Sequence, residues 1–169
     1  MIEETDPLLN EIASAFPLMD MPPRGNVLSI AASQYPSSDD LLRDIEEFRV
    51  KTVSEELIRA VYLELHNLSA EGWGWILPYY LRYCLGDDME SFRTELEFLI
   101  YKLDPKKEFL KTATENLSLM SKRQIECLIK VVQWCMSDQH WSEYFPENLQ
   151  GAMRFLQGLR KKKAWGVRP

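Results

Sequence analysis

Residues 121–137 read SKRQIECLIKVVQWCMS, and this stretch decides the fold. Ser121 is a residue type that caps helix starts, so we expect a helix from there to about Ser137. One polar stripe follows the helical repeat, formed by Glu126, Lys130, Gln133 and Ser137. The rest of the circumference is apolar, which predicts a helix surrounded by other helices at the centre of the core.

Further helical patterns lie on both sides of this stretch. Toward the C-terminus, Pro146 stands where a first helical residue would, and apolar positions recur up to the basic end at Arg160 to Lys163. Toward the N-terminus, similar patterns cover residues 5–16, 37–48, 54–68, 69–85 and 89–103. Val27 to Tyr35 is a short apolar segment that could be helix or strand, and we interpret it as helix. The prediction is an all-α, single-domain orthogonal bundle of about seven helices.

The composition suits one folded unit. The 169 residues are 46% hydrophobic and 27% charged, with only seven glycines. A chain of this length buries enough surface to fold without disulfides or metals. We assign residues 1–163 to one helical domain and residues 164–169 to a flexible C-terminal tail.

Three cysteines, Cys84, Cys127 and Cys135, fall within apolar helical patterns. An odd number at such spacing is not a disulfide framework, and it predicts core residues in a reducing compartment. The first residues are acidic, unlike a signal peptide, and no apolar run reaches the roughly 20 residues of a membrane span. We therefore expect a cytoplasmic protein without a membrane partner.

The residue types that carry catalysis or bind metals are sparse. His66 lies late in a helical pattern, His140 is placed in a loop beside Trp141, and both are interpreted as capping or surface residues. Cys127 and Cys135 stand eight residues apart, unlike the compact spacing of a zinc site. We predict no enzyme activity, no catalytic residue, no metal site and no cofactor.

The charge is unevenly distributed along the chain. Residues 1–98 contain 19 Asp and Glu against 7 Lys and Arg, whereas residues 99–169 contain 7 against 13. The acidic excess gathers on the helix predicted after Ser37, whose other face is apolar. The predicted partner-binding residues on its exposed face are Asp39, Asp40, Asp44, Glu46 and Glu47. Such a face favours a protein partner with a basic contact surface.

The segment from Leu68 to Asp88 reads LSAEGWGWILPYYLRYCLGDD. It resembles a family of small helical bacterial proteins of unknown function, and the likeness extends more loosely over residues 11–103. In that family a helix beginning after Leu-Ser or Leu-Thr runs into an aromatic and Leu-Pro patch. Here part of the aromatic group follows the Leu-Pro pair, at Tyr79 and Tyr80. The family has no defined site, so no functional residue is carried over.

This architecture is similar in character to that of immunity proteins, which bind and neutralise a cognate toxin in the bacterium that makes it. We therefore expect a protein-binding module, in particular a bacterial immunity protein that acts on a cognate secreted toxin. Two alternatives stay open. The basic C-terminal end, with Trp165 and Arg168, would suit a nucleic-acid-associated regulator, although the acidic remainder argues against nucleic acid. A carboxylate-based enzyme would need a site assembled from distant residues.

Overall fold

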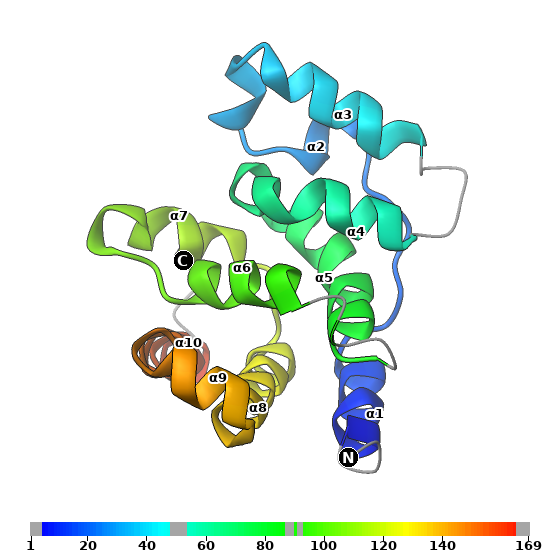
Figure 1. Ribbon diagram of the computed structural model, residues 1–169. Coiled ribbons are helices and arrows are strands. Elements are labelled where there is room, and N and C mark those ends of the chain that lie inside the picture. Colours follow the sequence, from blue (N-terminus) through cyan, green and yellow to red (C-terminus); the bar gives the residue numbers. More distant parts are fainter. Residues whose placement is uncertain (1–4, 48–53, 87–89, 91–92, 165–169) are drawn as a thin grey trace.

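The computed structural model describes residues 5–47, 54–86, 90 and 93–164, and the description below is confined to them (Figure 1). These residues form ten α-helices and contain no named β-strand. The helices are α1 (Thr5–Ala15), α2 (Arg24–Val27), α3 (Ser37–Glu47), α4 (Glu55–Val61), α5 (Ala70–Cys84), α6 (Arg93–Leu103), α7 (Leu110–Asn116), α8 (Lys122–Ser137), α9 (Gln139–Tyr144) and α10 (Pro146–Ala164). Three 3₁₀ helices add to them, η2 (Ala32–Gln34), η3 (Tyr62–Asn67) and η5 (Lys107–Phe109).

The all-α prediction is confirmed, but the number of helices is wrong: the described part alone has ten α-helices rather than about seven. The excess comes from short helices in segments where no helix was expected, namely α2, α7 and α9. Neighbouring elements decide whether such short segments become helical, because isolated helices of this length are unstable in water. The orthogonal arrangement and the single domain stay predictions.

Helix α8 lies at the centre of the lower half of the molecule, packed against α1, α9 and α10 (Figure 1). Ser121 caps it with a full capping box: its side chain accepts from the Gln124 backbone, and the Gln124 side chain accepts from the Ser121 backbone. Seven of its apolar residues are buried: Ile125, Cys127, Leu128, Ile129, Val131, Val132 and Cys135. The prediction of a central helix beginning at Ser121 is confirmed.

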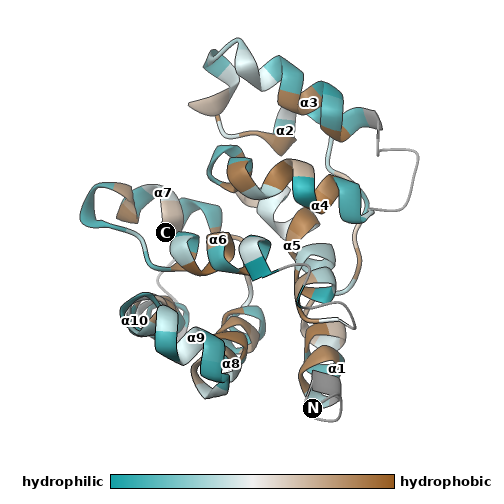
Figure 2. Ribbon diagram, in the orientation of Figure 1, coloured by the Kyte–Doolittle hydropathy of each residue, from teal (hydrophilic) through white to brown (hydrophobic). Residues whose placement is uncertain are grey.

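Helix α5 connects the two halves of the fold. It packs against α1, α2, α4, α6 and α7, and nine of its fifteen residues are buried. Figure 2 shows the hydropathy of the residues along it and along the neighbouring α4. Ser69 caps it by accepting from the Gly72 backbone N–H at 3.0 Å. The helix is continuous across Pro78, although proline lacks the N–H that would bond to the carbonyl four residues earlier. Gly74 lies four residues earlier, at the position whose carbonyl a proline ring crowds.

The prediction of one helix from Val27 to Tyr35 is wrong. Val27 is the last residue of α2, Leu28 is extended and forms an isolated antiparallel bridge with Leu68, and only the short 3₁₀ helix η2 follows within the segment. The Ser29 N–H donates to the Asn67 carbonyl and the Ser69 N–H donates to the Val27 carbonyl, both at 2.9 Å. These long-range bonds take backbone groups that a helix would have paired locally.

Two further predictions are corrected, and the start of α4 lacks a side-chain cap. Ser54 precedes α4, but its hydroxyl makes no capping bond, and this buried oxygen has no partner among the described residues. His140 belongs to α9 rather than to a loop, and its ring packs edge-on against Trp141 at a centroid distance of 5.3 Å. Ala164, assigned to the tail, is the last residue of α10, and residues 165–169 lie outside the described part.

Candidate functional site

The acidic face predicted from the sequence lies on α3. Asp39, Asp40 and Asp44 are exposed, while Leu41 and Ile45 on the other side of the helix are buried. The side chains thus divide as the periodicity predicted, with the acidic ones outward. The helix packs against α4 and η2, at the upper end of the molecule (Figure 1).

The five predicted partner-binding residues are not equivalent. Glu46 is half-buried and pairs with Arg24 at 3.0 Å. Asp40 pairs with Arg43 at 3.1 Å, and because both side chains are about 70% exposed this pair contributes little to stability. No described side chain forms an ion pair with Asp39 or Asp44. The side chain of Glu47 lies outside the described part. The acidic charge available to a partner is therefore concentrated on Asp39, Asp40 and Asp44.

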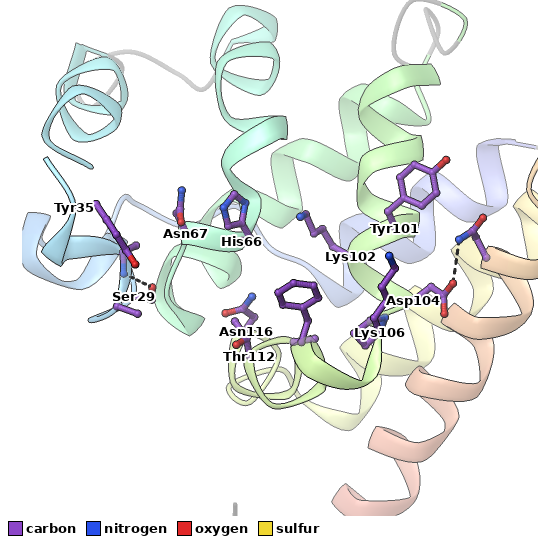
Figure 3. A pocket seen from close by; sticks show the side chains of 16 residues that line it. Ser29, Tyr35, His66, Asn67, Tyr101, Lys102, Asp104, Lys106, Thr112 and Asn116 are labelled. Atoms are coloured by element: carbon purple, nitrogen blue, oxygen red, sulfur yellow. Dashed lines mark hydrogen bonds between the residues drawn. The ribbon is translucent and has the colours of Figure 1, made fainter. Parts of the chain in front are cut away.

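A second surface feature is a half-open groove of about 920 Å³ that no sequence pattern indicated. It lies between η2 and η3 on one side and α6, the turn after it, and α7 on the other (Figure 3). Asn148 of α10 closes one end. We call this feature the α6–α7 groove.

One wall of the α6–α7 groove is held by the Leu28–Leu68 bridge. The hydrogen bonds on either side of the bridge fix Ser29 against Asn67, and both residues line the groove. The groove floor includes Asn116, which is buried although polar. In the orientation that satisfies its amide, Asn116 donates to the Leu68 carbonyl and accepts from Trp73 Nε1, each at 3.2 Å. Trp73 of α5 therefore holds in place a side chain that lines the groove.

The ionisable groups that line the α6–α7 groove are mainly basic: His66, Lys102 and Lys106 against Asp104. Asp104 accepts a hydrogen bond from Asn148 at 3.0 Å. Burial lowers the pKa of Lys102, whereas the nearby Glu64 carboxylate acts to raise it. Burial and then the Lys102 ammonium lower the pKa of His66, against smaller effects of Glu64 and of a backbone hydrogen bond to Leu63. Lys102 and Lys106 therefore place positive charge in a groove of an acidic protein, and the ammonium of Lys102 is partly desolvated.

The Asp104 side chain lies close to a glycine of α10. The Cβ of an alanine at position 151 would come within 1.8 Å of Asp104 Oδ1, whereas one at Gly158 on the same helix would meet nothing within 4 Å. We expect Gly151→Ala to be less stable than Gly158→Ala by about 1–3 kcal/mol, because Asp104 must move away from Asn148. Urea unfolding of both variants measures this difference. Equal stabilities would contradict the close approach.

The three cysteines are buried, as the sequence predicted. Burial raises the pKa of the Cys127 thiol to about 11 and raises those of Cys84 and Cys135 as well. The thiols are thus protonated near neutral pH and behave as small apolar core residues. Among the described residues, no group of three or more His, Cys, Asp or Glu side chains is placed to hold a metal ion.

Among the described residues, one carboxylate side chain is buried, which the sequence did not indicate. Glu95 of α6 is 5% exposed, and its Oε1 lies 3.9 Å from Arg59 of α4. Its backbone carbonyl accepts a hydrogen bond from the Tyr80 hydroxyl of α5. Glu95 thereby connects three helices, and this position gives it a structural role.

One residue of the basic C-terminal end forms a hydrogen bond within the fold. Lys161 and Lys162 are exposed, but Lys163 donates to the Ser118 carbonyl at 2.9 Å, just after α7. Trp165 and Arg168, which completed the proposed nucleic-acid surface, lie outside the described residues. The described part therefore offers a short run of exposed lysines at this end, and one of its basic residues is already bonded.

Comparison with known proteins identifies no relative: no protein-family model, no curated protein and no solved structure matches this chain. Within the described residues, no helix is both long enough and apolar enough to cross a membrane. The candidate functional features therefore come from the sequence and structure of this chain alone. They are the acidic α3 face and the α6–α7 groove of an all-α fold.

Proposed function

We propose that this chain acts by binding another protein stoichiometrically, and more narrowly that it is a bacterial immunity protein. In that role it would work in the cytoplasm and neutralise a cognate secreted toxin by covering a basic surface of it. The observation that carries the proposal is the exposed group Asp39, Asp40 and Asp44 on a helix whose other side is anchored in the core.

The physical basis is electrostatic steering. Opposed charges on two proteins accelerate their encounter, and the acceleration falls as salt screens the charges. Exposed charged pairs add little to affinity once the complex has formed, so the effect belongs mainly to the association rate. A blocking protein of this kind needs no chemistry of its own.

The first experiment is genetic. A secreted protein encoded beside this chain should stop the growth of a bacterial host when it is expressed in the cytoplasm, and co-expression of this chain should restore growth. The two purified proteins should form a complex of fixed stoichiometry. A neighbouring product that is harmless, or that is toxic and not bound, would count against the immunity function.

A matched pair of variants tests the surface. We expect neutralisation of the α3 face with Asp39→Asn, Asp40→Asn and Asp44→Asn to slow association by about threefold to tenfold at low salt. The control, Asp20→Asn, Glu115→Gln and Glu143→Gln, changes the net charge equally but on other exposed positions. Stopped-flow association at low and high ionic strength measures both variants. If the two associate at equal rates, the toxin does not meet the α3 face.

A further inference from the structure

The α6–α7 groove has the size and lining of a small-molecule site. Its volume of about 920 Å³ lies within the range of roughly 300–1,000 Å³ that is common for ligand pockets. Such pockets are mostly apolar and contain a few polar groups that fix the ligand. Phe109 and Ala113 supply apolar lining from η5 and α7, and Asn67 and Asn116 supply amides.

The charge in the α6–α7 groove selects the kind of ligand. Lys102 reaches from α6 toward His66 on the opposite wall, and Lys106 follows from the turn after α6 (Figure 3). No ion pair or hydrogen bond formed by the described residues holds the Lys102 ammonium. Asp104, the carboxylate of the lining, is engaged by Asn148. Two lysines and a histidine thus line a space whose own carboxylate is Asp104, and Glu64 acts electrostatically on Lys102.

The apolar part of the α6–α7 groove is incompletely covered by the protein itself. The Phe109 side chain is 60% exposed and that of Tyr35, across the groove, is 66% exposed. Leaving large rings in water forgoes the free energy of burying apolar surface, about 25 cal/mol for each Å². A ligand with an apolar body would cover these rings, and its negative group would meet the lysines.

We propose that the α6–α7 groove binds a small amphipathic organic anion, whose carboxylate lies between Lys102 and Lys106 and whose apolar body packs against Phe109 and Ala113. The negative charge of the anion compensates the positive charges of Lys102 and Lys106, which the fold brings into one groove with Asp104 as the carboxylate of the lining. This site is separate from the α3 face, so binding of the anion does not depend on a protein partner and is tested on the isolated chain.

Three probes that share one apolar body test the choice of charge. They are 4-phenylbutyrate, 4-phenylbutan-1-ol and 4-phenylbutylamine, each titrated into the full chain at pH 7 and low salt. We expect the carboxylate to bind with a dissociation constant of about 1 mM or lower and at least about tenfold more tightly than the alcohol. The amine should bind most weakly. Equal affinities for the three probes, or no saturable binding of the carboxylate, would overturn the proposal.

Neighbouring lysines provide a matched control. Lys102→Met keeps the apolar stem and removes the charge, and we expect it to abolish most of the preference for carboxylate over alcohol. Lys106→Met should reduce that preference, whereas Lys107→Met should leave it unchanged, because Lys107 is next in sequence but does not line the groove. If Lys107→Met weakens binding as much as Lys106→Met, the attraction comes from overall charge and not from the groove.

The two histidines give a readout that needs no substitution in the groove. His66 lines the α6–α7 groove, and His140 lies in α9 beside Trp141. A bound carboxylate favours the protonated imidazole nearby, so saturating 4-phenylbutyrate should raise the pKa of His66. Proton NMR titration measures this pKa, with His140→Gln to assign the signals and the His140 ring signals at fixed pH as the control. If the ligand leaves the pKa of His66 unchanged, or alters the His140 signals as much as those of His66, it does not occupy the groove.

Discussion

Replacing Gly72 with alanine is expected to lower the free energy of unfolding by about 2–4 kcal/mol. The Cβ of that alanine would lie 2.3 Å from the Val27 carbonyl oxygen and 3.2 Å from Leu68 Cβ. Because the first of these atoms belongs to the backbone, no side-chain rotation can relieve the clash. The segment at Val27 would have to move away from the start of α5.

That movement would break contacts that define the upper half of the fold. The Val27 carbonyl accepts from the Ser69 backbone at 2.9 Å, and the Leu28–Leu68 bridge follows directly. The cost of Gly72→Ala thus combines overpacking with the loss of long-range hydrogen bonds. One wall of the α6–α7 groove would be displaced at the same time, so binding of 4-phenylbutyrate should weaken together with stability.

Gly74 provides the control on the same helix, two residues further on. An added Cβ at Gly74 would meet nothing within 4 Å, so Gly74→Ala should be neutral or gain up to about 1 kcal/mol from the better helix propensity of alanine. Urea unfolding monitored by circular dichroism measures both variants. A Gly72→Ala protein as stable as Gly74→Ala would contradict the close approach of α2 to α5.

The sequence predicted best those elements whose signals are local. The α8 helix follows from Ser121 and the long apolar pattern, and α10 begins at Pro146 as expected. The start of α5 after Ser69 is also local, because the capping bond joins residues three apart. In each case the residues that form the signal lie within the helix itself or directly before its first turn.

Long-range features could not be predicted from local patterns. The segment after Val27 has an apolar run that suits helix or strand, and its bonds with Asn67 and Ser69 decide the matter from about 40 residues away. The α6–α7 groove likewise draws His66, Lys102 and Asn116 from separate elements. The nearest thing to a sequence signal for this groove is the apolar pair Phe109 and Leu110 within a lysine-rich segment. The structure shows that both residues are exposed.

Trp75→Ala is expected to have the largest effect on stability, a loss of about 3–5 kcal/mol. Trp75 lies on α5, the helix that joins both halves of the molecule, and its side chain is only 3% exposed. Removing the indole leaves a cavity that the surrounding helices cannot fill without moving. For a protein of this size the Tm should fall by roughly 6–20 °C.

An exposed aromatic residue provides the comparison. Tyr144 of α9 is 68% exposed, so Tyr144→Ala should cost at most about 0.5–1 kcal/mol. Thermal unfolding and partner binding, measured on both variants, separate a core role of Trp75 from a role in an interface. A core role predicts that Trp75→Ala lowers the Tm, and that the fraction still folded binds the toxin with unchanged affinity. If Trp75→Ala instead kept the wild-type Tm and lost the partner, the indole would belong to a contact surface, and the aromatic segment of α5 would replace the α3 face as the first place to look for the toxin.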